Sequence, residues 1–207
     1  MVPLARILVP LDFSERCVGA IRYAEALAAQ AGSEITLLHV LEPLRYNFAT
    51  LEGGVGLSEL MENLDVQARQ QLEAFRCEAL ERFQVTRVVL EGDPARSIVD
   101  YARAQHIDLI AMPTHGYGLF RRFILGSVTA KVLHDAECPV LTGVHMEEAP
   151  PMESLAIRTV LCAVDLGPQS RKALGWAAQV AANFSARLVL AHAVPCIESL
   201  PGEYFDR

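Results

Sequence analysis

The fold is decided by residues 7–41, which read ILVPLDFSERCVGAIRYAEALAAQAGSEITLLHVL. The run at 7–11 is short and wholly apolar, which is typical of a strand covered on both faces. Ser14 then opens an alanine-rich stretch whose apolar residues recur at helical spacing, and Gly32 ends it. Because a second apolar run follows at 35–41, the stretch predicts the strand–helix–strand unit of a parallel sheet.

The alternation of apolar runs and helical stretches continues to about residue 145. Asp93 is placed to cap a helix that begins at Pro94. The further elements that we expect are helices over 58–83, 94–106 and 127–136, and strands over 85–91, 108–112 and 139–144. Short connections between such elements give right-handed crossovers, so the sequence predicts an α/β domain with a doubly wound, five-stranded parallel sheet.

A second, shorter copy of the opening unit follows an acidic, proline-bearing segment. Asp12 and Asp165 each end an apolar run, and His39 and His192 follow them at equal distances along the chain. We expect three parts, namely a domain at 1–145, a linker at 146–156 and a truncated β-α-β repeat at 157–207. Because an incomplete parallel unit leaves strand edges exposed, the repeat should pack on the first domain, complete itself across a dimer, or be a truncation of a longer gene.

Charge, cysteine content and apolar runs exclude several classes of partner and location. The net charge of −7 argues against a general affinity for nucleic acid or for an anionic membrane. The five cysteines are scattered and odd in number, which fits neither a disulfide framework nor a zinc site, so we expect no metal ligands. The first apolar run is too short for a signal peptide, and no run is long enough to span a membrane. The sequence therefore predicts a cytoplasmic protein.

A glycine-bearing loop at 112–127 follows the fourth expected strand. Gly116 and Gly126 would let the backbone approach a ligand closely. At the start of the next helix, the N–H groups of Gly126, Ser127 and Val128 would point at an anion on the helix axis. The alternative is that Ser127 only caps its helix and that the glycines only make turns.

Asp12 ends the first strand, where doubly wound sheets place their ligands. Its carboxylate could accept a hydrogen bond from a ribose or a base, or it could cap the helix that starts near Ser14. Its recurrence as Asp165 does not separate the two, because a cap would recur as well. His39 recurs as His192, which fits a structural role better than a ligand.

With these residues the chain resembles the universal stress protein family. The nucleotide-binding members carry Gly-x2-Gly-x9-Gly-(Ser/Thr) after the fourth strand, and Gly116, Gly126 and Ser127 match the last three fixed positions. The other matching motifs are ILVPLDFS at 7–14, Leu38-His39-Val40, Gly92-Asp93-Pro94, Leu125-Gly126-Ser127-Val128 and Cys138-Pro139-Val140. The resemblance covers residues 4–145 and, in truncated form, 157–194.

The resemblance implies a Rossmann-like, adenine-nucleotide α-hydrolase-like fold. It also implies that this fold binds ATP or another adenine nucleotide, alone or with Mg²⁺, in a regulatory role in stress response. Asp12 and Val40 would meet the adenine and ribose, Met112 would line the base pocket, and the phosphates would be held by Gly116, Gly126, Ser127 and Val128. The residues implied at the nucleotide are Pro10, Asp12, Val40, Met112, Pro113, Gly116, Gly126, Ser127 and Val128. The family also implies a homodimer, often formed through the last strand.

One position departs from the family pattern, because Pro113 stands where the motif has its first glycine. Proline fixes φ near about −65° and has no N–H, so one backbone contact is lost and the loop entry is stiffened. The alternative function is therefore a dimerising interaction module of the same family that binds no nucleotide, its protein partner unknown.

The expected chemistry is slow hydrolysis at most, with no catalytic residue. The sequence has no Gly-x4-Gly-Lys-(Ser/Thr) motif, no evident general base beside the loop and no carboxylate pair for two metals. An enzyme that adenylylates its substrate is disfavoured, because it would want a glycine loop straight after the first strand, where Asp12-Phe13-Ser14-Glu15 stands.

Overall fold

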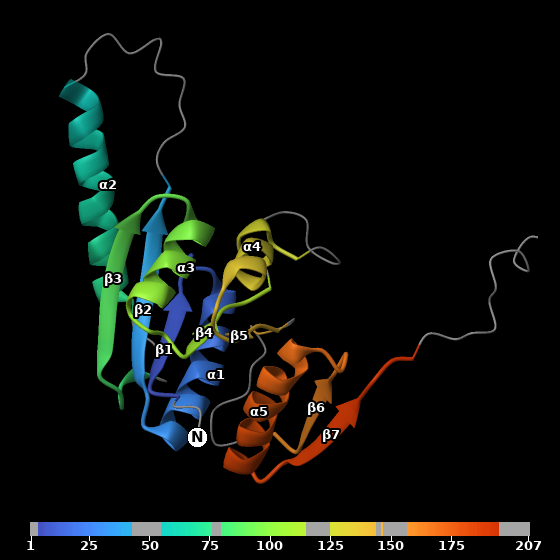
Figure 1. Ribbon diagram of the computed structural model, residues 1–207. Coiled ribbons are helices and arrows are strands. Elements are labelled where there is room, and N and C mark those ends of the chain that lie inside the picture. Colours follow the sequence, from blue (N-terminus) through green and yellow to red (C-terminus); the bar gives the residue numbers. More distant parts are fainter. Residues whose placement is uncertain are drawn as a thin grey trace, which may run out of the picture. The chain divides into compact units, whose positions relative to one another are not determined.

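The computed structural model describes residues 4–42, 55–75, 80–114, 125–143, 146 and 157–194, and it divides into two compact units (Figure 1). The larger unit lies within Pro3–Leu155 and the smaller within Ala156–Arg207. The strands of the larger unit are β1 (Arg6–Pro10), β2 (Glu34–Leu41), β3 (Val85–Glu91), β4 (Leu109–Ala111) and β5 (Val140–Leu141). Its helices are α1 (Glu15–Ala31), α2 (Val55–Ala74), α3 (Pro94–Ala104) and α4 (Ser127–Asp135).

The five strands form one parallel sheet in the order β3-β2-β1-β4-β5, which confirms the predicted doubly wound sheet. From β1 the chain builds outward through β2 to β3 and then crosses to the other side of β1, where it adds β4 and β5. The strand order therefore reverses between β1 and β4. In open α/β sheets this switch point is where the carboxyl ends of two strands leave a crevice for a ligand.

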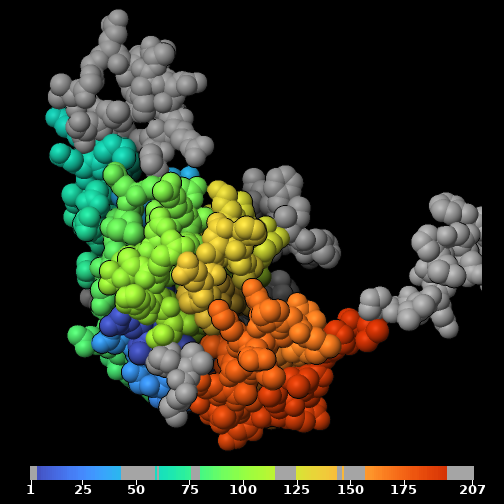
Figure 2. Space-filling model, in the orientation of Figure 1, coloured from blue at the N-terminus to red at the C-terminus, as the bar shows by residue number. Residues whose placement is uncertain are grey.

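Helices cover both faces of this sheet because successive apolar side chains of the strands point to opposite faces. Leu8, Leu38 and Ile110 pack in one buried cluster with residues of α3 and α4. Ile7 and Val9 are fully buried on the opposite face of β1, which α1 covers. Figure 1 shows α3 and α4 on one side of the sheet and α1 on the other, and Figure 2 shows α3 and α4 side by side on the surface.

Two elements are clearly shorter than predicted. The helix expected over 58–83 is Val55–Ala74, and a short turn closes at Phe83, whose N–H donates to the Leu80 carbonyl at 3.1 Å. Arg87 of β3 donates to the Leu72 carbonyl in the last turn of α2 at 3.1 Å, a long-range bond that helix propensity does not encode. The strand expected over 139–144 is only Val140–Leu141.

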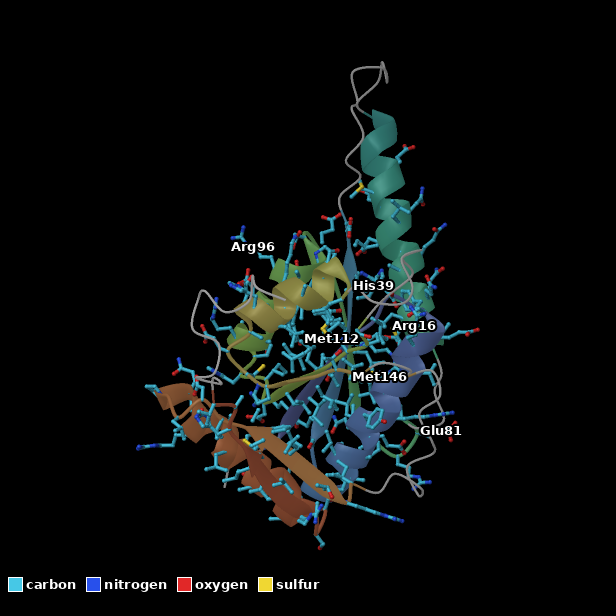
Figure 3. The ribbon with its side chains drawn as sticks, turned by 90° about the vertical axis from the view of Figure 1, so that its right-hand side faces the viewer. Arg16, His39, Glu81, Arg96, Met112 and Met146 are labelled. Atoms are coloured by element: carbon cyan, nitrogen blue, oxygen red, sulfur yellow. The ribbon has the colours of Figure 1, made fainter. Side chains whose placement is uncertain are left out.

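The described residue Met146 lies against α1. Met146 is buried, with 3% of its surface exposed, and Figure 3 shows it beside this helix. A Cβ added to Gly19 of α1 would overlap the Met146 carbonyl and lie 2.8 Å from the Met146 Cβ. Gly19 is therefore required by a close approach of two backbones, at a point where the sequence predicts the start of a linker.

The smaller unit repeats the opening of the larger one. It consists of β6 (Thr159–Ala163), α5 (Pro168–Asn183) and β7 (Arg187–Ala191), and its two strands are parallel. Val160 pairs with Leu188 as Ile7 pairs with Ile35, at matching positions of the two copies. The predicted β-α-β repeat is therefore confirmed in its register as well as in its elements. None of the helices in the described ranges is long and apolar enough to cross a membrane.

Candidate functional site

The sheet brings most of the predicted site residues to the carboxyl edge of its central strands. Asp12 follows β1, and Met112 and Pro113 follow β4, so they flank the switch point. Three predicted residues from different elements, Val40, Met112 and Val128, share one apolar cluster (Figure 3 labels Met112). The predicted residues within the described ranges are Pro10, Asp12, Val40, Met112, Pro113, Gly126, Ser127 and Val128, whereas Gly116 lies outside them.

Asp12 sits at the centre of a tight turn between β1 and α1. Its Oδ1 accepts hydrogen bonds from the Ser14 N–H and from the Cys17 thiol, each at 3.0 Å. Phe13, between them, has a left-handed backbone with φ 61°. Burial raises the pKa of Asp12, but the hydrogen bonds from Cys17 and Ser14 outweigh it, so the pKa lies below its usual value. Asp12 thus stays ionised and orders the entry to α1, where Ser14 is the N-cap.

His39 fixes the backbone in front of this turn. Its Nδ1 donates to the Leu11 carbonyl at 2.8 Å, and since a carbonyl can only accept, Nδ1 carries the proton. The imidazole also lies against the Phe13 ring, with 4.5 Å between centroids. In the smaller unit, His192 makes the same bond to the Val164 carbonyl at 2.8 Å. The geometry agrees with the structural role expected for His39.

The base of the glycine loop is closed by hydrogen bonds between its two ends. The Gly126 N–H donates to the Thr114 carbonyl at 2.9 Å, and the Thr129 hydroxyl donates to the Pro113 carbonyl at 3.1 Å. The expectation that the Gly126 N–H faces an anion is therefore wrong, because this donor closes the loop. Sequence spacing could not reveal this bond, since it joins residues on either side of the loop.

The start of α4 nevertheless offers backbone donors. Gly126, not Ser127, is the N-cap, so the reading of Ser127 as the cap is also wrong. A glycine cap has no side chain to bond the first turn. The N–H groups of Ser127, Val128 and Thr129 precede the first helical hydrogen bond, from the Ala130 N–H to the Gly126 carbonyl, so they have no acceptor within the helix. They carry the positive end of its dipole.

Pro113 fits the sheet without the loss of a bond to β5. The N–H groups of Ile110, Met112 and Thr114 donate to the β5 side at 3.0, 3.0 and 3.4 Å. Position 113 is out of phase with this ladder, because successive residues of a strand direct their N–H groups to opposite sides. The missing N–H of Pro113 would have pointed away from β5, so the proline changes the loop entry while leaving the β4–β5 pairing intact.

Sequence reasoning missed two polar residues of the site, Cys17 and Thr129. Cys17 could have been found from the repeat, because Ser170 occupies its position in the smaller unit and also donates to an aspartate. Thr129 gave no such signal. A cavity of about 300 Å³ lies at the opposite end of the sheet, near Ile107 and Cys138, away from these residues. Within the described ranges, no group of three or more His, Cys, Asp or Glu residues could hold a metal ion.

Cys17 should resist alkylation in the folded protein. The thiol is buried, and burial together with the Asp12 charge raises its pKa to about 12. Because only the thiolate reacts, we expect labelling of Cys17 by iodoacetamide at pH 8 to be at least about 100-fold slower in the native than in the unfolded chain. Peptide mass spectrometry after timed labelling measures this ratio. Equal rates in both states would contradict the hydrogen bond to Asp12.

Comparison with known sequences agrees with this arrangement. The model of the Universal stress protein family matches residues 4–142 and 156–207. Universal stress protein MJ0577 of Methanocaldococcus jannaschii is 31% identical over 149 residues, which cover 66% of this chain and 92% of the relative. A universal stress protein of Mycolicibacterium smegmatis is 26% identical over 192 residues, which cover 90% of this chain and 63% of the relative.

Solved structures of universal stress proteins resemble this chain as well. The structure of MJ0577 superposes with a TM-score of 0.59 at 29% identity, covering 68% of this chain and 95% of that one. A universal stress protein from Archaeoglobus fulgidus superposes with a TM-score of 0.62 at 25% identity, covering 92% of this chain and 67% of that one. The family match covers both the larger unit and the partial repeat, and the chain therefore belongs to the universal stress protein family.

Proposed function

We propose that residues 1–145 bind ATP, or another adenine nucleotide, in a regulatory role in stress response. Many members of the family bind ATP, and this property of the family motivates the proposal. The observation that carries it is the α4 N-terminus, whose glycine cap leaves backbone donors open beside the switch point of the sheet. In this proposal 146–156 is a linker and 157–207 a partial second domain that binds no nucleotide.

The phosphates would lie on the helix axis at Ser127, Val128 and Thr129, where backbone N–H groups and the dipole favour an anion. The backbone of Gly126, with φ −58° and ψ 144°, is open to any residue, so its conformation does not demand glycine. A glycine at this position would instead be explained by the close approach of a ligand to the backbone. Mg²⁺ would be held mainly by the phosphates and water, as this ion commonly is.

The base and ribose would lie across the switch point. Val40, which is partly buried, offers apolar surface close to the buried Met112, and the ionised Asp12 offers an acceptor for a hydroxyl or amino group. With its pKa lowered and two donors on Oδ1, Asp12 is a weak base, which supports binding rather than fast hydrolysis.

The second candidate is a dimerising interaction module without a nucleotide. Members of the family often dimerise, and β5 lies at an edge of the sheet, where a second copy could add its own strand. Pro113 also favours this candidate, because it removes one backbone donor from the loop entry.

Released nucleotide separates the two candidates. The purified protein is denatured and the supernatant is chromatographed for ATP, ADP and AMP, while a thermal melt compares the protein with and without millimolar MgATP. We expect bound adenine nucleotide, or a melting temperature raised by ATP, since a ligand that binds only the folded state stabilises it. An empty protein that gains no stability supports the interaction module.

Replacing Pro113 by glycine should strengthen ATP binding. The Pro113→Gly variant regains an N–H at the loop entry, which can donate to the ligand, so we expect the Kd for ATP to fall about 3- to 10-fold. The gain in chain freedom should lower stability by about 0.5–1 kcal/mol. Isothermal titration calorimetry measures the affinity, with Pro168→Gly at the start of α5 as the matched control. An unchanged or weaker affinity would show that this position does not limit binding.

A further inference from the structure

The Cys17 thiol makes a directed contact with the residue proposed to bind the nucleotide. Cys17 is 1% exposed, and its Sγ donates to Asp12 Oδ1 at 3.0 Å. The Ser14 hydroxyl lies 3.7 Å from the same sulfur, and the Ser14 N–H is the second donor to Oδ1. Two donors on one oxygen fix the plane of the carboxylate, and with it the direction in which the other oxygen points.

We propose that Cys17 is a positioning residue, which holds Asp12 through Oδ1 so that Oδ2 is presented to a hydroxyl or amino group of the nucleotide. The inference rests on the proposed function, because it assigns a ligand to Asp12. Cys17 itself does not touch the nucleotide.

The partial repeat carries the same arrangement with a different donor. Ser170 stands at the position of Cys17, and its hydroxyl donates to Asp165 Oδ1, as does the Gly167 N–H at 2.8 Å. Leu166 has φ 65°, which matches the left-handed Phe13. A thiol in one copy and a hydroxyl in the other share the ability to donate to the aspartate, so the hydrogen bond is the common feature of the two turns.

The Cys17 thiol remains a hydrogen-bond donor at physiological pH. Burial and the Asp12 charge raise the pKa of the Cys17 thiol to about 12, so the thiol stays protonated. On the aspartate, burial raises the pKa while the Cys17 hydrogen bond is the largest of the effects that lower it. Removing the donor should therefore raise the pKa of Asp12. A cysteine that only fills space would have no such effect.

The test compares Cys17→Ala with Cys17→Ser. Calorimetry with MgATP gives the Kd, and carboxyl-carbon NMR across pH gives the pKa of Asp12. For Cys17→Ala we expect an affinity about 3- to 10-fold weaker and a higher Asp12 pKa. Cys17→Ser, which supplies the hydroxyl seen at Ser170, should restore both values. Ser170→Ala, the equivalent change in the repeat, should leave ATP affinity unchanged. Urea unfolding confirms that the variants are folded.

A double-mutant cycle with Asp12→Asn shows whether Cys17 acts through Asp12. We expect Cys17→Ala to cause no further loss of affinity once Asp12 is neutral. An equal loss in both backgrounds, or a Cys17→Ala variant with the wild-type Kd and Asp12 pKa, would overturn the inference. A wild-type protein that binds no ATP overturns the proposed function instead, and an unchanged Asp12 pKa in Cys17→Ala then overturns the inference separately.

Discussion

A Gly126→Val variant should bind ATP at least about 100-fold more weakly than the wild type, a loss of about 2.7 kcal/mol. Gly126 is the N-cap of α4, and the proposed phosphate position lies against the first N–H groups of that helix. The two methyl groups of valine would fill the space through which the phosphates approach these donors. A charge-assisted contact is lost when its partners are held apart, because its strength depends on a short distance.

The fold should survive this change. With φ −58° and ψ 144°, the Gly126 backbone lies in a region that valine also adopts. Valine is a poorer cap than glycine, so we expect stability to fall by no more than about 1 kcal/mol. Gly167→Val, at the N-cap of α5 in the smaller unit, is the matched control and should keep wild-type affinity. Calorimetry measures the affinity of both variants for ATP. A Gly126→Val variant with wild-type affinity would show that the nucleotide does not bind at the start of α4.

The second large effect concerns stability. Gly19→Ala should lower the free energy of unfolding of the larger unit by about 1–3 kcal/mol, although alanine is the better helix former. A Cβ at this position overlaps the Met146 carbonyl, so Met146 must move off α1. Met146 is 3% exposed, and its displacement would uncover apolar surface as well.

Gly175→Ala is the matched control, because it is also a glycine-to-alanine change within a helix. A Cβ at Gly175 of α5 meets nothing within 4 Å, so this variant should gain about 0.5–1 kcal/mol. Urea unfolding followed by far-UV circular dichroism reports both units, while the fluorescence of Trp176, the single tryptophan, reports the smaller one. A Gly19→Ala variant as stable as the wild type would contradict the close approach.

The elements of the fold could be predicted because they are encoded locally. Apolar runs and helical spacing predicted β1, α1 and β2, and a short cap signal predicted α3, where Asp93 accepts from the Arg96 N–H at 3.0 Å. The boundaries that failed depend on contacts between distant residues. The end of α2 at Ala74 and the burial of Met146 involve Arg87 and Gly19, which no local pattern connects to them.

The places of the candidate residues in the fold could be predicted from the sequence, but their hydrogen bonds could not. The family resemblance placed Asp12 and the start of α4 at the same edge of the sheet, and the strand order agrees. The pairing of the Gly126 N–H with the Thr114 carbonyl was not foreseen, because spacing shows which donors lie near a helix start and not which of them are occupied. The contact of Cys17 with Asp12 could be predicted only from the repeat, where Ser170 stands at the equivalent position and donates to Asp165.

We propose that one adenine nucleotide binds to each chain, in the larger unit. Titration calorimetry of nucleotide-free protein with MgATP tests it most directly, because it returns affinity and stoichiometry together. We expect one ATP per chain, with binding lost in Gly126→Val and kept in Gly167→Val. No binding at millimolar ATP, or two equal sites per chain, would contradict it.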